Sequence, residues 1–266
     1  MRNEKKHERK ISANKVLAAV FLCVFLFALW KVGSILLEYR EIDKLYEDTV
    51  AEYTTDESAS EPIEVDLESL REENDDVIGW IYIPDTNVNF PLLQGTDNDQ
   101  YLYQSYEKEY LTAGSIFLDY RCSDDFSDAN TVIYGHNMHN GSMFGKLKKY
   151  ASEDYREDHP YIYIMEADGS WNKYEVIAYF MADVTGPVYE LPLAASSAEE
   201  ASASGELTGA SMTSEFEELA QTIAESNVYS GDVELAPGDK LITLSTCTQD
   251  SRNDARNVLI AQLLTE

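Results

Sequence analysis

The sequence contains little cysteine and little positive charge, and each shortage argues against a class of protein. Only three cysteines occur in 266 residues, at Cys23, Cys122 and Cys247. Cys23 lies in a long apolar run, so at most one disulfide can join the other two, and a disulfide-stapled scaffold is excluded. Lys and Arg number 20 against 49 Asp and Glu, for a net charge of −29. Phosphate binding needs a basic surface, so this balance argues against a nucleic-acid partner.

What positive charge there is gathers at the start of the chain. Residues 1–15 hold six basic and two acidic side chains, a net of +4, ahead of an acidic remainder. The 22 residues 16–37 are apolar apart from Lys31, and a helix of that length spans roughly 30 Å of hydrocarbon. No small-residue cleavage site follows, so we expect an uncleaved transmembrane signal anchor. The basic head predicts a cytoplasmic N-terminus, a single pass through the cell membrane and an extracellular location for residues 38–266.

Residues 38–65 have the pattern of a helical stalk followed by a linker. Apolar side chains recur at helical spacing over residues 39–53, which predicts a helix. The polar stretch 54–64 is typical of a short linker. The remainder, residues 66–266, is long and apolar enough for one sizeable globular domain, with 44% hydrophobic residues in the whole chain.

Short β-like runs dominate the chain from Val77 onward. Eight such runs predict strands, at residues 77–83, 88–93, 115–120, 131–136, 161–165, 173–184, 240–247 and 255–264. Eight strands with few helices predict a mainly β fold, a closed or nearly closed antiparallel barrel rather than a βαβ sheet.

Two helices and one insertion are predicted around these strands. Asp66 is placed to cap a helix that ends near Asn74. Ser214 is placed to cap a second helix in the stretch SEFEELAQTIAESN, before the last two strands. Residues 193–213 are rich in Ala and Ser with scattered acidic residues, which predicts a flexible insertion.

Two strand ends carry reactive side chains. Cys247 closes the apolar strand that ends in TLSTC and precedes a polar loop, with Arg252 and Arg256 following within ten positions. A cysteine at a strand end is commonly a small buried hydrophobe, but an extracytoplasmic thiol beside a polar loop and basic residues favours a nucleophile. His136 ends the strand TVIYGH and enters a loop rich in Gly and Asn, in which Ser142 is placed to cap a short helix.

The pair His136 and His139 also suggests a metal site, which we disfavour. Catalytic zinc sites use three protein ligands, and neither a third nearby histidine nor HExxH spacing accompanies the pair. We therefore expect no metal or other cofactor, and a structural or surface role for His139.

Taken together, these segments resemble the sortases. The pattern consists of TLSTC, an arginine that opens a strand nine residues later, and YGHN followed by MF upstream, and the resemblance covers about residues 66–264. The stretches NDDVIGWIYIPDTNVNFPLLQGTDNDQYL and GSIFLDYR resemble class B in particular. The resemblance implies an eight-stranded sortase-type barrel with N-terminal helices and a helix before the cysteine strand. It implies Cys247 as nucleophile, His136 as general acid and base, and Arg256 as the third catalytic residue. It also implies that four residues line the substrate-peptide groove: Asn98, Leu102, Ser245 and Tyr189.

The chemistry that the resemblance implies is acyl transfer at a C-terminal sorting motif of a secreted protein, of the Asn-Pro-x-Thr or the Ser-Pro-x-Thr type. The thiolate of Cys247 attacks the carbonyl after the Thr, and His136 protonates the departing amine. An amine of the peptidoglycan cross-bridge, or of its lipid-linked precursor, then takes the acyl group. Arg256 donates hydrogen bonds to the oxyanion or the substrate carbonyl.

The protonation state of the Cys–His pair is not set by ordinary pKa values. At pH 7 about 3% of the thiol is thiolate and about 24% of the histidine is protonated, so both occur together in roughly 0.7% of molecules. Either the fold couples the two groups or the enzyme works through a minority form.

Several alternatives stay open at this point. Arg252 also follows Cys247, but it lies in a polar turn, whereas Arg256 opens a strand that would run back beside TLSTC with a restrained guanidinium. A secreted cysteine peptidase or amidase would share the Cys–His pair, although papain-like hydrolases place the cysteine first and here His136 precedes Cys247 by 111 residues. A membrane-tethered scaffold without activity would leave the Cys, His and Arg contexts unexplained.

Overall fold

Two units make up the chain, Met1–Leu45 and Tyr46–Glu266. The computed structural model describes residues 13–55, 63–190, 209–231, 233, 235–236, 238–247 and 255–264.

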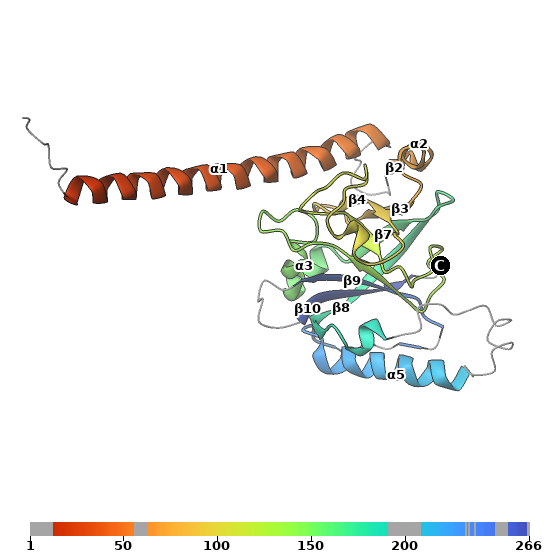
Figure 1. Cartoon of the computed structure of the whole chain (residues 1–266). Helices are drawn as coiled ribbons and strands as arrows, with labels where there is room; N and C mark the ends of the chain where they lie inside the picture. The colour runs from red at the N-terminus through yellow and green to blue at the C-terminus, as the bar shows by residue number, and fades with distance from the viewer. Residues whose placement is uncertain are drawn as a thin grey trace, which may run out of the picture. The chain divides into compact units, whose positions relative to one another are not determined.

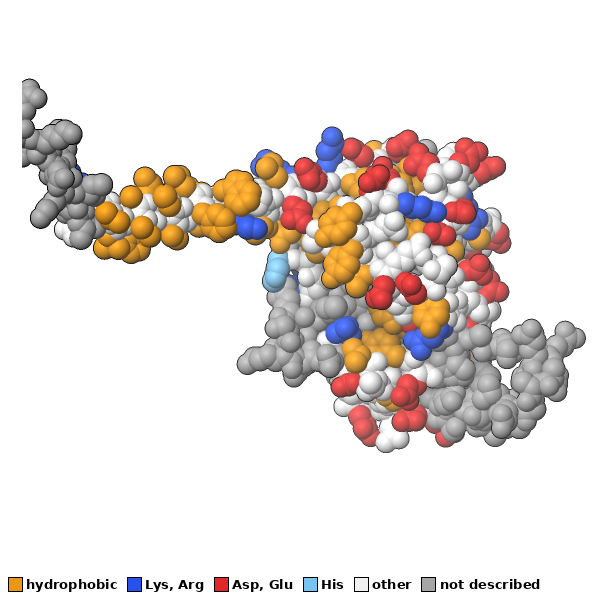
Figure 2. Space-filling model, in the orientation of Figure 1, with side chains coloured by type: hydrophobic (Ala, Val, Ile, Leu, Met, Phe, Trp, Pro, Cys, Tyr) orange, Lys and Arg blue, Asp and Glu red, His pale blue; other side chains and the backbone are white. Residues whose placement is uncertain are grey.

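A single helix, α1 (Ala13–Tyr53), accounts for the described part of the first unit (Figure 1). Hydrophobic side chains cover its apolar stretch in Figure 2, and Phe21 and Trp30 are 67% and 63% exposed. One 18-residue window has a mean hydropathy of 2.4 and no buried residue. An apolar helix this long meets the length requirement for a membrane span, so the predicted anchor at residues 16–37 lies within a helix able to serve as one.

The last turns of α1 belong to the second unit and pack onto it. The hydroxyl of Tyr46 donates to the main-chain oxygen of Gly114 at 2.6 Å, and its ring meets that of Phe90 edge-on at 5.0 Å. Beyond the helix, β1 (Thr54–Thr55) pairs with β2 (Glu64–Val65) in an antiparallel ladder. Part of the predicted linker, residues 56–62, lies outside the described residues.

The predicted helix after Asp66 is present. Helix α2 (Leu67–Glu73) begins directly after Asp66, whose carboxylate accepts hydrogen bonds from both the main-chain N–H and the hydroxyl of Ser69. The cap satisfies a backbone donor that the helix itself leaves unpaired.

Eight strands close into a barrel, as predicted. In chain order they are β3 (Val77–Tyr82), β4 (Asn89–Leu93), β5 (Ile116–Leu118), β6 (Asn130–Tyr134), β7 (Tyr161–Met165), β8 (Trp171–Asp183), β9 (Leu241–Cys247) and β10 (Ala255–Leu263). Around the barrel the order is β10-β8-β7-β3-β4-β5-β6-β9, and β9 pairs with β10 to close the ring.

The barrel is mixed rather than antiparallel, which corrects one prediction. β4 pairs with β5 in parallel, and so does β6 with β9. A parallel neighbour needs a long connection to bring the chain back to the same end. The 22 residues between β4 and β5 supply one, and β6 and β9 are separated by two strands and several helices. Strand periodicity reports local structure only, so it does not reveal which strands become neighbours.

Aliphatic side chains from alternate strand positions fill the barrel. Ile81 of β3 and Ile164 of β7 occupy paired positions and are both fully buried. Burying a side chain of this size stabilises the fold by about 1.5–3 kcal/mol. Trp80 is also fully buried, and its indole N–H donates to Oδ1 of Asn89 at 2.6 Å, so its polar atom is satisfied.

Several helices connect the strands. They are η1 (Gln100–Leu102), η2 (Leu147–Ala151), α3 (Glu153–Asp158), η3 (Pro187–Tyr189) and α5 (Gly209–Ser226). Helix α5 runs beneath the β8–β10 side of the barrel in Figure 1 and packs against β8 and η3.

Two predicted helix caps are wrong. Helix α5 begins at Gly209, so Ser214 lies within the helix rather than at its start. Ser142 caps no helix either, because η2 begins at Leu147 after Lys146. The hydroxyl of Ser142 instead donates to Oδ1 of Asn140. Residues 209–213 of the predicted insertion are helical, and residues 193–208 lie outside the described residues.

Candidate active site

The three predicted catalytic residues lie at one end of three adjacent strands. β9 runs between β6 and β10, and Cys247 at its end pairs with Arg256 of β10. On the other side Tyr134 of β6 pairs with Ser245, and the N–H of Gly135 donates to the main-chain oxygen of Ser245 at 3.2 Å. β6 and β9 are parallel, so two further residues along each bring His136 level with Cys247.

A pocket of about 290 Å³ opens at this strand end. Its lining residues come from β5, β6, β9, β10 and the loops beside them, and they are Asn98, Leu102, Phe117, Arg121, Tyr134, Gly135, His136, Val184, Tyr189, Ser245, Thr246 and Arg256. Every predicted site residue except Cys247 is in this set, and Cys247 follows Thr246 directly.

The imidazole of His136 is held by its neighbours in a defined tautomer. Its Nε2 lies 2.7 Å from the main-chain oxygen of Leu102. A carbonyl only accepts, so Nε2 carries the proton of this bond and Nδ1 is left to exchange a proton. The ring of Tyr103 lies beside it, with centroids 5.5 Å apart. Burial lowers the pKa of His136, and the bond to Leu102 opposes this effect only in part.

Steric crowding explains why the YGHN segment has a glycine before His136. A Cβ atom on Gly135 would lie 2.6 Å from side-chain atoms of both Ile116 and Phe144. The N–H of Phe144 in turn donates to the main-chain oxygen of His136 at 3.0 Å. The backbone can therefore bring His136 to the strand end only with glycine before it.

Two predicted groove residues contact each other. The hydroxyls of Ser245 and Tyr189 are hydrogen-bonded at 2.8 Å and both side chains are buried. The amide of Asn130 ties the same connection to the barrel, because Nδ2 donates to the main-chain oxygen of Val188 and Oδ1 accepts from Thr243. The short helix η3 is thus fastened over β9 beside the pocket.

Asn98 and Leu102 line the pocket from the connection between β4 and β5. Oδ1 of Asn98 accepts from the main-chain N–H of Tyr120 at 3.0 Å, which ties this connection to the end of β5. Leu102 closes η1 and supplies the carbonyl that binds His136. Its role in the site therefore includes its main chain, which the sequence pattern did not indicate.

The structure describes one of the two candidate arginines. Arg256 is the second residue of β10, partly exposed, and its Nη1 donates to the main-chain oxygen of Ala255 at 3.3 Å. Arg252 lies outside the described residues.

Three residues at the pocket that sequence reasoning did not assign form a linked group. The guanidinium of Arg121 binds the carboxylate of Asp119 through two parallel bonds, of 2.9 Å from Nε and 2.7 Å from Nη2. The hydroxyl of Tyr134 donates to the same carboxylate at 3.0 Å. Burial raises the pKa of Asp119, but the bonds from Arg121 and Tyr134 outweigh it and the net shift is downward. The sequence does contain a signal for this pair, because an acidic and a basic residue lie two positions apart in GSIFLDYR.

The remaining candidates for reactive or ligating groups do not line the pocket. Cys122 is a free, buried thiol whose Sγ accepts from the N–H of Val132 at 3.4 Å. Burial raises its pKa to about 12. His139 is exposed. Among the residues that the structure describes, no three His, Cys, Asp or Glu side chains are grouped as a metal site.

Comparison with known proteins gives one consistent result. The family model of the sortase domain matches residues 81–264. Sortase B of Listeria monocytogenes is 35% identical over 256 residues, which cover 95% of this chain and 97% of that protein. The crystal structure of sortase B from Bacillus anthracis in complex with AAEK1 has 28% identity and a TM-score of 0.66, covering 87% of this chain and all of that one. The Staphylococcus aureus sortase B–substrate complex has 26% identity and a TM-score of 0.60, covering 74% and 84% of the two chains.

The family match covers nearly all of the barrel and all the lining residues of the pocket, and the similarity to sortase B extends over nearly the whole chain. The chain therefore belongs to the sortase family and is a cysteine transpeptidase of class B.

Proposed function

We propose that this enzyme cleaves a C-terminal sorting motif after its Thr and joins the new carboxyl end to an amine of peptidoglycan or its precursor. Cys247 acts as nucleophile, His136 as general acid and base, and Arg256 as donor to the carbonyl oxygen. The observation that carries the proposal is the strand register, in which Cys247 pairs with Arg256 while the parallel partner of β9 leads into His136.

The first half-reaction forms a thioester. The thiolate of Cys247 attacks the carbonyl carbon of the Thr, and the oxygen takes up negative charge. The C–N bond to the following residue then breaks, and the leaving amine takes a proton from the imidazole of His136. Since Nε2 is bound to the Leu102 carbonyl, Nδ1 is the nitrogen that gives and receives this proton.

The second half-reaction reverses the roles. An incoming amine attacks the thioester carbonyl and gives its proton to His136, and the C–S bond breaks to return the thiolate. A new amide joins the cleaved protein to the amine. In both steps the guanidinium of Arg256, opposite Cys247 on β10, donates hydrogen bonds to the oxygen that becomes negative.

Burial of His136 favours its neutral form and reduces the fraction of imidazolium at neutral pH, because its pKa is lowered. A free imidazolium would therefore be even rarer than ordinary pKa values imply. The thiolate is the natural counter-charge, so proton transfer from Cys247 to His136 is expected to be coupled.

The proposed location of the reaction is the outer face of the cell membrane. An N-terminal helix long and apolar enough to span a bilayer precedes the barrel, and a basic head precedes the helix. Both substrates, a secreted protein and a cell-wall amine, would be met there.

The test uses the full-length chain in detergent micelles with a fluorogenic Asn-Pro-Ala-Thr peptide and a Ser-Pro-Ala-Thr counterpart. The wild type should cleave one of them and form an amide product when an amine such as triglycine is added. Cys247→Ala should abolish both reactions. Cys122→Ala should retain them, because this buried thiol with a raised pKa is not ionised at neutral pH.

Two outcomes would contradict the proposal. Equal loss of activity in the two alanine variants would indicate a structural role for the cysteines. Cleavage without any amide product over a range of amines would favour the secreted peptidase instead, since a hydrolase passes the acyl group to water.

A further inference from the structure

We infer that Arg121 is a specificity-determining residue that binds a neutral carbonyl oxygen of the substrate peptide and disfavours a carboxylate at the same point. The inference rests on the proposed function, because it assigns a contact within the same substrate pocket. Its starting observation is that a guanidinium held by a buried carboxylate lines the pocket (Asp119–Arg121).

The carboxylate of Asp119 is fully occupied. Oδ1 accepts from the N–H and Nε of Arg121, and Oδ2 accepts from Nη2 of Arg121 and the hydroxyl of Tyr134. A carboxylate has about four acceptor positions, so none is left for a ligand. The side chain of Asp119 is fully buried, and its function in this group is to hold the guanidinium.

Arg121, in contrast, has side-chain N–H donors that its bonds to Asp119 do not use. A guanidinium carries five N–H bonds, and its hydrogen bonds to described residues use one on Nε and one on Nη2. The side chain is 45% exposed, in a pocket wall. The two-bond contact fixes its plane, so the free N–H bonds point in set directions and binding costs little side-chain entropy.

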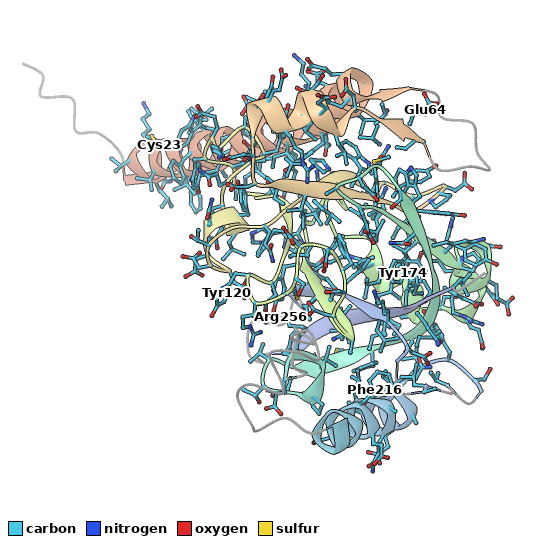
Figure 3. All side chains as sticks on the ribbon, turned by 90° about the vertical axis from the view of Figure 1, so that its right-hand side faces the viewer. Cys23, Glu64, Tyr120, Tyr174, Phe216 and Arg256 are labelled. Atoms are coloured by element: carbon cyan, nitrogen blue, oxygen red, sulfur yellow. The ribbon has the colours of Figure 1, made fainter. Side chains whose placement is uncertain are left out.

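The backbone that carries the pair is also fixed. Nε2 of Gln94 donates to the main-chain oxygens of Asp119 and Cys122, on either side of Arg121. Figure 3 shows Tyr120, the neighbour of Arg121, on the same side of the barrel as Arg256, with Tyr174 on the other side. Arg121 and Arg256 both line the same pocket. A peptide with its Thr at Arg256 can therefore reach Arg121 with another residue.

The charge of the pair determines the class of ligand. The guanidinium is already neutralised by Asp119, in a chain of net charge −29. A carboxylate brought up to Arg121 would lose its hydration without gaining an uncompensated cation at that point. An amide carbonyl accepts the same hydrogen bonds at a smaller desolvation cost. The acceptor is therefore a carbonyl of the peptide, either of a side-chain amide or of the main chain.

The experiment measures kcat/KM of full-length variants in micelles with the Asn-Pro-Ala-Thr peptide. Arg121→Ala should lower kcat/KM by roughly 10- to 100-fold, mainly through KM, as for loss of uniform binding. Arg121→Lys should lose less, because the ammonium keeps the charge beside Asp119 but lacks the fork. The control Lys108→Ala removes another cation, one that pairs with Asp75 outside the pocket, and should leave kcat/KM unchanged.

Peptide variants distinguish the two sources of the carbonyl. If the side chain is bound, Asn→Ala in the peptide should reduce the activity of wild type but have little further effect on Arg121→Ala. If the main chain is bound, replacing a peptide bond of the substrate by an ester should instead reduce the activity of wild type and have little further effect on Arg121→Ala. If the side chain is bound, the Asn→Asp peptide should also be a poorer substrate than Asn→Ser for the wild type.

Folding and function are checked separately. Alkylation of Cys247 by iodoacetamide should proceed at the wild-type rate in both Arg121 variants, which shows that the site is formed. If Arg121→Ala does not fold, Arg121→Lys must still show the rise in KM. Wild-type kcat/KM in a folded Arg121 variant overturns the inference alone, and so does a preference of the wild type for the Asp peptide where the peptide side chain is the group bound. A wild type that cleaves no peptide overturns the proposed function beneath it.

Discussion

Single side chains at the strand end differ in charge because their surroundings differ. Burial raises the pKa of Cys122 to about 12 and keeps this thiol neutral. Burial lowers the pKa of His136 and keeps the imidazole neutral. Asp119 is buried as well, yet its pKa is lowered, because burial is outweighed by Arg121 and Tyr134. Desolvation acts on all three, and the strength of the interactions that oppose it decides the outcome.

Arg256 should be essential for turnover. We expect Arg256→Ala to lower kcat/KM by at least about a hundredfold, the scale of losing one oxyanion donor. Arg256→Lys should restore little, because an ammonium lacks the planar fork. Arg252→Ala, measured on the same sorting peptide, should stay within a few-fold of wild type. A greater loss in the Arg252 variant would exchange the roles of the two arginines.

Asp128 should make stability depend on pH. Its carboxylate is buried and accepts from the N–H and the hydroxyl of Ser123. Burial raises its pKa to about 6, while the bonds from Ser123 act in the opposite direction. With the folded pKa above the ordinary value, the folded state binds more protons, so this stability is lost as pH rises through about 6. The Tm of Asp128→Asn relative to wild type should therefore increase between pH 5 and pH 7.

Asp125, in the same loop, provides the matched control. Its hydrogen bond from the Ser127 side chain is the largest influence and lowers its pKa. The pKa of Asp125 then lies below pH 5 in both the folded and the unfolded state. The Tm difference between Asp125→Asn and wild type should therefore be constant from pH 5 to pH 7. Equal pH dependence in the two variants would show that Asp128 is not the titrating group.

Among the connecting elements, η1 has the most direct effect on the site. Its last residue, Leu102, supplies the carbonyl that sets the tautomer of His136. Gly114 lies against it with φ of +55°, a region that favours glycine. A Cβ at this position would lie 2.4 Å from the Leu102 oxygen and 2.5 Å from the Tyr101 oxygen. The orientation of His136 thus depends on a glycine 22 residues away in sequence.

Replacement of Gly114 should therefore affect catalysis as well as stability. Gly114→Ala should lower Tm and reduce kcat/KM by about tenfold or more, because the displaced carbonyl no longer holds Nε2 of His136. Gly169→Ala is the control, since Gly169 also has a positive φ of +85° but would place its Cβ in open space. It should lower Tm by the backbone cost alone and leave kcat/KM intact. Unchanged kcat/KM in both variants would contradict the role assigned to η1.

At the scale of the whole molecule, charge and hydropathy divide the chain. The basic residues 1–15 and the apolar helix precede a strongly acidic remainder, whose acidic side chains are prominent in Figure 2. A large net negative charge favours solubility and disfavours non-specific association. The same asymmetry predicts orientation, because Lys and Arg beside a span remain in the cytoplasm.

Protease accessibility tests that orientation. Protease added to intact protoplasts should digest residues 38–266, because the proposed topology exposes the barrel on the outer face. A cytoplasmic marker protein in the same sample should survive until the cells are lysed. Protection of the barrel in intact protoplasts, followed by digestion after lysis, would reverse the topology.

Local pattern was sufficient for the parts of this protein that depend on near neighbours in sequence. The eight strands, the helix capped by Asp66 and the apolar span follow from periodicity, capping and length, each of which acts over a few residues. The motifs around His136 and Cys247 were enough to indicate the family, because those reactive residues occur in short recognisable segments. The predicted start of α5 at Ser214 was wrong. Serine is a favourable helix cap wherever it occurs, and only the tertiary context determines that the helix begins earlier, at Gly209.

Tertiary structure decided what depends on distant segments. The parallel pairs β4–β5 and β6–β9 follow from loop routes that strand patterns do not encode. The bond between His136 and Leu102, the contact of Ser245 with Tyr189 and the saturated carboxylate of Asp119 each join residues whose proximity or geometry arises only when the barrel closes. Sequence determined which residues can do chemistry here, whereas closure of the barrel determined which of them meet, because directional hydrogen bonds form only between groups that packing has already brought together.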